Sequence, residues 1–186
     1  MQGYLLEMAV FSATSLVLTW VSRRPLRKPG SHGYYRYFAW ECMTMMFVLD
    51  LRTWHVDEQA LHQVIAGVLF LISLLLVLFG LWLLLRHGKS DRRRDDVPML
   101  SFEKTTVLVT SGVYRYIRHP IYGSLFFLCW GFCFKNPTPA AVILGVAASA
   151  FLLATARVEE NENLNYFGEE YREYMKRSKM FVPFLL

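Results

Sequence analysis

The clearest apolar segment of the chain runs from residue 64 to residue 85, twenty-two residues that carry no charge and are rich in leucine. A helix needs about 20 apolar residues to cross the hydrocarbon core of a bilayer, so this segment is long enough to span one. Composition agrees, because 54% of the 186 residues are hydrophobic and 19% are charged, which is too apolar for an ordinary soluble domain. The sequence therefore predicts an integral membrane protein with a single domain, residues 1–186.

Four other apolar segments are candidates for helices, and they occupy residues 4–21, 37–51, 121–134 and 140–156. Only helices and closed barrels satisfy their backbone polar groups inside a bilayer. The pattern therefore predicts an all-α fold with about five transmembrane helices. The segment at 37–51 has the weakest claim, because it contains Glu41 and Asp50. Glu41 either reaches interfacial water near a helix end or belongs to a site and needs a buried partner.

The C-terminal part of the chain is polar but carries a stripe of apolar residues. Leu164, Phe167, Tyr171 and Tyr174 recur at spacings of three, four and three, with Asn, Glu, Arg and Lys elsewhere. This spacing places the four side chains on one face of a helix. We therefore expect an amphipathic helix that lies along the cytoplasmic membrane surface and covers the adjoining loops.

Lysine and arginine are divided unevenly among the loops between the predicted spans. Eighteen of the 20 fall in three segments, 23–36, 86–118 and 157–179, which five spans place on one side. Only Arg52 and Lys135 fall on the other side. Because loops rich in these residues stay in the cytoplasm, the amino terminus is predicted outside and the carboxyl terminus inside. The net charge of +5 is thus assigned to cytoplasmic loops at the bilayer, the expected partner, rather than to nucleic acid.

The sequence lacks several common catalytic and binding motifs. It contains no HExxH, no Walker loop, no GxGxxG and no Ser-His-Asp spacing, so it does not predict the chemistry that each of them supports. Cys129 and Cys133 lie one helical turn apart, but no further ligand is spaced to join them. Because structural metal sites usually need four ligands, no metal site is expected.

Residues 112–123, which read GVYRYIRHPIYG, form a compact polar stretch directly before an apolar segment. Arg118 and His119 precede Pro120, which is favoured in the first turn of a helix because its missing N–H would have no partner there. The apolar segment at 121–134 follows at once. Ionisable residues at the mouth of a membrane helix are candidates for a functional site.

A second polar group, formed by Arg157, Glu159 and Glu160, follows the apolar segment at 140–156. Only a short turn at residues 136–139 joins this segment to the one before it, so the two should form an antiparallel pair whose polar ends meet. Polar groups so close to hydrocarbon need mutual pairing. The residues alone leave two readings open: a salt-bridge cluster that anchors two helices, or a site for a charged small molecule.

Residues 108–122, LVTSGVYRYIRHPIY, resemble the first half of the signature of the isoprenylcysteine carboxyl methyltransferase superfamily, which includes phospholipid methyltransferases. The second half of that signature is a glutamate pair followed by Phe-Gly-x-x-Tyr-x-x-Tyr. It is found here as Glu159-Glu160 and residues 167–174. The motifs cover about residues 102–183. The whole chain is also similar to bacterial members of this superfamily, which implies the bacterial inner membrane.

This resemblance implies a membrane-embedded methyltransferase that uses S-adenosylmethionine, with a helical fold and a cofactor pocket on the cytoplasmic side. The residues that it places around the cofactor belong to the segment before the GxY turn, to that turn, to the HPxY residues and to the glutamate pair. They are Thr106, Val107, Leu108, Val109, Tyr114, His119, Pro120, Ile121, Tyr122 and Glu159.

Methyl transfer from a sulfonium is an in-line displacement that depends on positioning more than on covalent help. A carboxylate or thiolate acceptor needs only a cation to orient it, and Arg118 or Arg157 can supply one. An ammonium acceptor must first lose a proton, which Glu160 or His119 can accept. Arg118, Glu160 and Arg157 are therefore the predicted catalytic residues.

The resemblance favours a lipid-like acceptor with a carboxylate, as in the isoprenylcysteine enzymes, where an arginine just before the glutamate pair helps to hold that group. Here the matching position is Thr155, and Arg157 stands nearby. Phosphatidylethanolamine and a small thiol are the alternative acceptors. Two other functions stay open: a non-catalytic membrane scaffold, and a membrane reductase related to the sterol reductases, for which the chain is short.

Overall fold

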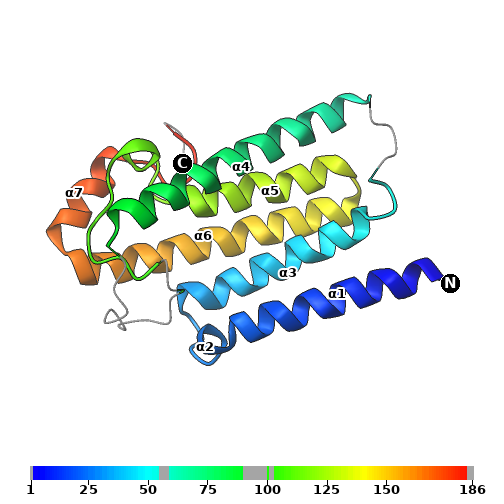
Figure 1. Ribbon diagram of the computed structural model, residues 1–186, viewed down its shortest axis with the longest axis horizontal. Helices are drawn as coiled ribbons and strands as arrows, with labels where there is room; N and C mark the ends of the chain where they lie inside the picture. Colours follow the sequence, from blue (N-terminus) through cyan, green and yellow to red (C-terminus); the bar gives the residue numbers. More distant parts are fainter. Residues whose placement is uncertain (1, 55–58, 90–99, 101–102, 184–186) are drawn as a thin grey trace.

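The computed structural model describes residues 2–54, 59–89, 100 and 103–183, so most of the predicted charged loop at 86–97 lies outside the described residues. Figure 1 shows an elongated bundle of long helices that lie side by side. They are α1 (Gln2–Val21), α3 (His32–Asp50), α4 (Leu61–His87), α5 (Pro120–Lys135) and α6 (Pro139–Phe167). The shorter helices are α2 (Arg23–Leu26), η1 (Gly112–Arg115) and α7 (Glu169–Arg177).

Among the described residues, three helices are long and apolar enough to cross a membrane: Tyr4–Val21 within α1, and the whole of α4 and α6. They coincide with the predicted spans at 4–21, 64–85 and 140–156. The other two predicted spans are also helical, as α3 and α5, but α3 carries three charged residues and α5 has only 16 residues. The all-helical prediction is therefore confirmed, with three candidate spans rather than five.

Two predictions are wrong: the single amphipathic helix through residues 164–174, and the loop at 23–36 without helices. Helix α6 continues beyond residue 156 to Phe167 and ends at Gly168, whose φ of 62° favours glycine. The predicted apolar stripe is therefore divided, with Leu164 and Phe167 in α6 and with Tyr171 and Tyr174 buried in α7. The basic loop predicted at 23–36 contains α2 and the first residues of α3.

Helix α6 lies between α3 and α5 and forms the centre of the bundle (Figure 1). Several of its buried residues are small, among them Ala141, Ala148 and Ala156. Small residues let neighbouring helix backbones approach closely. Met46 of α3 and Cys129 of α5 are buried in the same cluster. This packing aligns the start of α5 with the end of α6.

Polar contacts attach α1, most of whose side chains are exposed, to α3. The Ser15 hydroxyl donates a hydrogen bond of 2.6 Å to the carboxylate of Glu41. Arg52, which follows α3, forms an ion pair with Glu7. Glu41 thus has a partner in a neighbouring helix, and it does not line the pocket described below.

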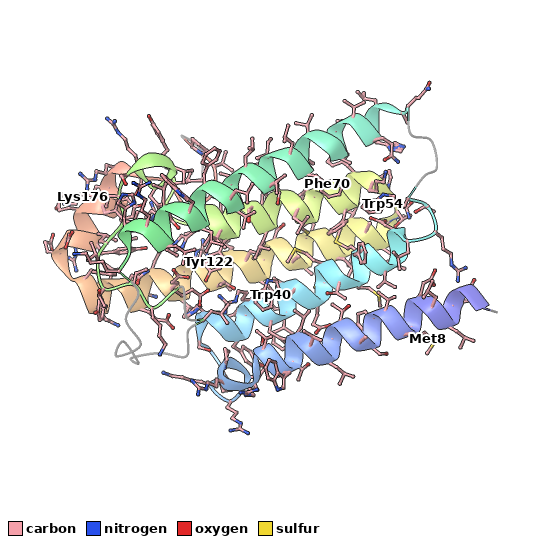
Figure 2. The ribbon with its side chains drawn as sticks, viewed as in Figure 1. Met8, Trp40, Trp54, Phe70, Tyr122 and Lys176 are labelled. Atoms are coloured by element: carbon pink, nitrogen blue, oxygen red, sulfur yellow. The ribbon has the colours of Figure 1, made fainter. Side chains whose placement is uncertain are left out.

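The connection between α1 and α3, the segment from residue 103 to the start of α5, and α7 all lie at one end of the bundle, on the left in Figure 1. Lys176 of α7 lies at this end, whereas Trp54 and Phe70 lie toward the other (Figure 2). The turn between α5 and α6 is also at that other end. The polar end therefore collects segments that are far apart in the sequence.

Gly131 of α5 provides a test of how closely α4 and α5 pack. A Cβ atom at Gly131 would lie 2.4 Å from Cε1 of Phe70 on α4. We expect Gly131→Ala to destabilise the protein by about 1–3 kcal/mol, because extra volume in a packed contact forces side chains to shift. Unfolding of the detergent-solubilised protein measures this change.

Gly67→Ala is the matched control, because a Cβ atom there would meet nothing within 4 Å. The control should be neutral or stabilising by up to about 1 kcal/mol, since alanine is the better helix former. Equal effects of the two substitutions would contradict the packing seen between α4 and α5.

Candidate active site

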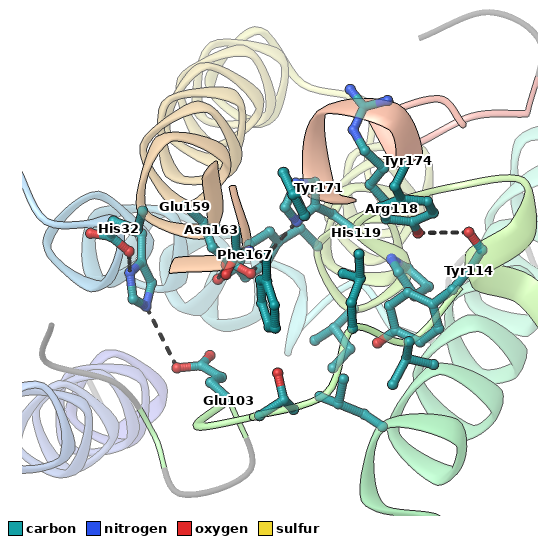
Figure 3. A pocket seen from close by; sticks show the side chains of 18 residues that line it. His32, Glu103, Tyr114, Arg118, His119, Glu159, Asn163, Phe167, Tyr171 and Tyr174 are labelled. Carbon is teal, nitrogen blue, oxygen red and sulfur yellow. Dashed lines mark hydrogen bonds and ion pairs between the residues drawn. The ribbon is translucent and has the colours of Figure 1, made fainter. Parts of the chain in front are cut away.

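A pocket opens at the polar end of the bundle, among α3, α6, α7, the segment at 103–109 and the start of α5 (Figure 3). Nine of the predicted site residues line it: Leu108, Val109, Tyr114, Arg118, His119, Pro120, Ile121, Tyr122 and Glu159. Other lining residues were not predicted to form a site: His32, Leu84, Glu103, Thr105, Glu162, Asn163, Phe167, Tyr171 and Tyr174. Both halves of the sequence signature therefore contribute to one cavity.

The GxY turn, η1, is fixed by close packing and by two tyrosine hydroxyls. Gly112 has a φ of 59°, and a Cβ atom there would lie 2.6 Å from Cδ1 of Leu83, so only glycine fits this turn. The Tyr174 hydroxyl donates to the backbone oxygen of Tyr114 at 2.6 Å. The Tyr114 hydroxyl in turn donates to the backbone oxygen of Gly80 at 3.4 Å. These contacts hold the buried Tyr114 ring at the wall of the pocket.

Arg118 joins the start of α5 to the end of α6 and to the C-terminal segment. Its Nε donates to Oε1 of Glu160 at 2.7 Å, and its Nη1 donates to the backbone oxygen of Ser178. The Arg118 amide also donates to the backbone oxygen of Lys179 at 2.7 Å. Charge-assisted bonds of this kind are about twice as strong as neutral ones. Arg118 therefore positions three segments as well as lining the pocket.

Glu159, Tyr122 and His119 form a compact group within the pocket. The Tyr122 hydroxyl donates to Oε2 of Glu159. The His119 ring stacks on the Tyr122 ring, with 5.5 Å between centroids, and its Nδ1 lies 3.8 Å from Oε1 of Glu159. Its buried Nε2 has no hydrogen-bond partner among the described residues. A ligand can therefore meet a carboxylate, a phenol and an imidazole together.

A second polar group joins α3 and α6 to the segment before the motif (Figure 3). His32 Nδ1 lies 2.5 Å from Oε2 of Glu162, and His32 Nε2 lies 3.6 Å from Oε2 of Glu103. Arg36 forms an ion pair with the same Glu103 carboxylate. Burial alone would raise the pKa of Glu103, but Arg36 and His32 outweigh this effect and lower that pKa to about 2.

Sequence reasoning missed this second group because its members were counted only as loop and helix-end charges. One signal was present: His32 and Arg36 are four residues apart, which places them on one face if residue 32 begins a helix. The helix was expected to begin only at residue 37, so that face was not considered. Pairing with Glu103 and Glu162 depends on tertiary contacts that no local pattern specifies.

The phenols of Tyr114 and Tyr171 stay neutral in the pocket. Burial raises the pKa of each phenol, and the negative charge of Glu159 raises it further. Tyr171 is 2% exposed and Tyr114 is 6% exposed. Both rings therefore offer apolar faces to a ligand, and each hydroxyl keeps its proton.

Four predicted site residues do not line the pocket. Glu160 lies beside it, held by Arg118, with its Oε1 3.5 Å from His119 Nε2. Thr106 donates from its hydroxyl to the backbone oxygen of Lys89 at 2.8 Å, and Val107 is 42% exposed. Arg157 is exposed. Roles for these residues in binding or catalysis stay predictions.

Thr155, where the resemblance leads us to expect an acceptor-binding arginine, is fully buried within α6. Its hydroxyl donates to the backbone oxygen of Phe151, one turn earlier, at 2.8 Å. Neither Thr155 nor the exposed Arg157 lines the pocket. The position that would carry an acceptor-binding cation therefore carries an internally bonded hydroxyl.

Comparisons with known proteins agree with the sequence signature. The model of the phospholipid methyltransferase family matches residues 62–170, which is more than half of the chain. A methanethiol S-methyltransferase of Crocosphaera subtropica is 24% identical over 169 residues, which cover 87% of this chain and 64% of that protein. A methanethiol S-methyltransferase of Pseudomonas deceptionensis is 26% identical over 143 residues, 74% of this chain and 52% of that protein.

A shorter similarity links the chain to another group of methyltransferases. The protein-S-isoprenylcysteine O-methyltransferase of Homo sapiens is 37% identical over 83 residues, 44% of this chain and 29% of that protein. The chain thus spans less than two thirds of the length of each relative named here. No solved structure matches it significantly.

Replacing Arg118 tests its structural contribution to the site. We expect Arg118→Gln to lower the free energy of unfolding by about 3–5 kcal/mol, because it leaves the mostly buried carboxylate of Glu160 without its guanidinium. Chemical unfolding in detergent measures the loss. Arg172→Gln is the control, since Arg172 is 65% exposed and pairs with the exposed Glu169. Its effect should be below about 1 kcal/mol, and an equal loss in both variants would contradict this account.

Proposed function

The chain belongs to the phospholipid methyltransferase family, and on that premise we propose that it is a membrane-embedded methyltransferase, one domain over residues 1–186, that uses S-adenosylmethionine. The observation that carries the proposal is the environment of Glu159. Among the described residues, this pocket carboxylate contacts a phenol and an imidazole but no guanidinium or ammonium group. A cationic ligand would supply the missing charge.

The residues around the pocket fit the parts of this cofactor. Glu159 would hold a positively charged group, with Tyr122 fixing the orientation of its carboxylate. The aromatic rings of Tyr114, Phe167 and Tyr171 and the apolar side chains of the segment at 108–109 would cover the uncharged parts. When bound, the cofactor supplies an electrophilic methyl group and a neutral thioether leaving group.

We propose that all five long helices, α1, α3, α4, α5 and α6, cross the membrane. Five crossings place the segments at 23–36, 86–118 and 157–179 on the same side, and these segments hold most of the lysine and arginine residues. The amino terminus would then be outside and the pocket cytoplasmic. Helix α7 would lie at the membrane surface, with Tyr171 and Tyr174 packed inward.

We propose a small thiol as the methyl acceptor. Both methanethiol S-methyltransferases named above align with most of this chain. In addition, no arginine stands at the position that would hold an acceptor carboxylate, because Thr155 occupies it and is buried. A prenylcysteine carboxylate is the second candidate, supported by the 37% identity to the human isoprenylcysteine enzyme over 83 residues.

The pocket residues can assist this transfer by positioning, by excluding water and by accepting a proton. Holding two reactants in the correct geometry can lower a barrier by roughly 7–11 kcal/mol. A thiol acceptor must also lose its proton to become a nucleophile. We assign that proton to Nε2 of His119, which is buried, lacks a hydrogen-bond partner among the described residues and lies 3.5 Å from the Glu160 carboxylate.

An assay of the purified protein in lipid vesicles tests the proposal. Methyl-labelled S-adenosylmethionine and methanethiol are supplied, and we expect the label in dimethyl sulfide. Label in a base-labile ester, after a prenylcysteine is supplied instead, would favour the second candidate. Label in choline-type headgroups would favour phospholipid. The absence of label from every acceptor would contradict the proposed function.

Tyr122→Phe tests the contribution of the pocket within the same assay. A hydrogen bond to a charged group is worth about 1.5–3 kcal/mol. We therefore expect kcat/KM to fall about tenfold to a hundredfold. Tyr116→Phe is the control, because Tyr116 belongs to the same motif but is 51% exposed. Equal losses in both variants would count against a role for the Tyr122–Glu159 contact.

A further inference from the structure

Three of the four acidic residues in and beside the pocket have an arginine or histidine nitrogen within hydrogen-bond distance. Glu103 pairs with Arg36. Glu160 accepts a hydrogen bond of 2.7 Å from Nε of Arg118. Glu162 lies 2.5 Å from Nδ1 of His32, which stands between Glu162 and Glu103 and can donate from both ring nitrogens when protonated. Each pairing replaces an isolated negative charge with a near-neutral dipole.

Glu159 differs from these three. Its contacts among the described residues are the Tyr122 hydroxyl and the His119 ring, whose Nδ1 is 3.8 Å away. Its side chain is also the most exposed of the four, at 25%, and lies near the middle of the pocket (Figure 3). The negative charge that a ligand meets is therefore concentrated at Glu159.

The cations nearest to this charge on α3 are already occupied. His32 and Glu103 line the same pocket as Glu159, and Arg36 pairs with Glu103. Arg36 is 3% exposed, so little water screens its charge. Without Glu103, its guanidinium would act directly on Glu159 and on any cation bound there. The Glu103 carboxylate therefore controls how much negative charge the pocket offers.

We propose that Glu103 is a specificity-determining residue: by neutralising Arg36 it preserves the negative charge at Glu159, so that the pocket prefers the sulfonium form of the cofactor to its demethylated product. This inference rests on the proposed function. S-adenosylmethionine carries one more positive charge than S-adenosylhomocysteine, and otherwise differs by a methyl group. A pocket with this charge distribution favours the substrate and releases the product after transfer.

Helix α3 supplies this control from outside the segment that matches the family. His32 and Arg36 precede residue 62, where that match begins. Glu103 lies within the match, next to the segment that forms one wall of the pocket. The N-terminal part of the chain would thus adjust the binding preference of a site built by the C-terminal part.

Comparison of Kd values for S-adenosylmethionine and S-adenosylhomocysteine, by calorimetry on the full chain in detergent, tests the inference. In Glu103→Gln we expect the preference for the sulfonium form to fall about tenfold, because the freed positive charge of Arg36 would repel the sulfonium across a poorly screened site. An unchanged ratio of the two Kd values would overturn the proposal. Because both ligands share the same pocket, general loosening would weaken both and leave their ratio unchanged.

Arg36→Gln is the opposite single variant, and it keeps the test decisive if Glu103→Gln does not fold. It leaves the negative charge of Glu103 in place, so the preference for S-adenosylmethionine should rise by at least about threefold. A fall or no change would overturn the proposal. The double variant Arg36→Gln/Glu103→Gln restores the balance of charge, so its ratio of the two Kd values should return to within about twofold of the wild type. A double variant whose ratio equals that of either single variant would also overturn the proposal.

Glu173→Gln is the matched control for charge. It makes the same chemical change on α7, at a side chain that is 58% exposed and pairs with Lys176. The ratio should not change in this variant, and a shift equal to that of Glu103→Gln would overturn the proposal. If wild-type protein bound neither ligand, the proposed function itself would fail. Binding of both ligands with a ratio insensitive to Glu103 would remove only this inference.

Discussion

Arg118 holds together three segments that are distant in the sequence. Its side chain bonds Glu160 at the end of α6 and the backbone near Ser178, and its own amide pairs with Lys179. The Arg118 guanidinium and the Glu160 carboxylate have little access to water. An unmade hydrogen bond in such a place is costly. The rest of the pocket depends on this connection, because it fixes the start of α5 against α6 and holds the C-terminal segment in contact with the start of α5.

Different interactions hold the bundle together in its middle and at its polar end. Away from the pocket, small and sulfur-containing side chains such as Ala148 and Cys129 allow α3, α5 and α6 to pack closely. At the polar end, ion pairs and hydrogen bonds replace apolar packing as the means of holding segments together. The proposed chemistry belongs at this end, because the pocket and its charged residues lie there.

Much of the site followed from the sequence because its parts lie on two helices joined by a short turn. An antiparallel pair was enough to predict that the start of α5 would face the Glu159-Glu160 pair, and the contact between Tyr122 and Glu159 confirms it. The single amphipathic helix predicted through residues 164–174 was wrong, because apolar spacing alone did not show that the positive φ of Gly168 would divide the stripe. His32 was missed for a different reason: its meaning depends on a carboxylate 130 residues away in the sequence.

The central claim is that Glu159 forms a cationic-ligand site at the mouth of the α5–α6 pair. Titration of the purified protein with S-adenosylmethionine in a calorimeter, beside Glu159→Ala, tests it most directly. Loss of a charge-assisted contact of about 1.5–3 kcal/mol should weaken binding at least about tenfold. Measurable binding by the wild type and this loss in Glu159→Ala are the predicted result. Absence of binding by the wild type, or equal affinity in the two proteins, would contradict the account.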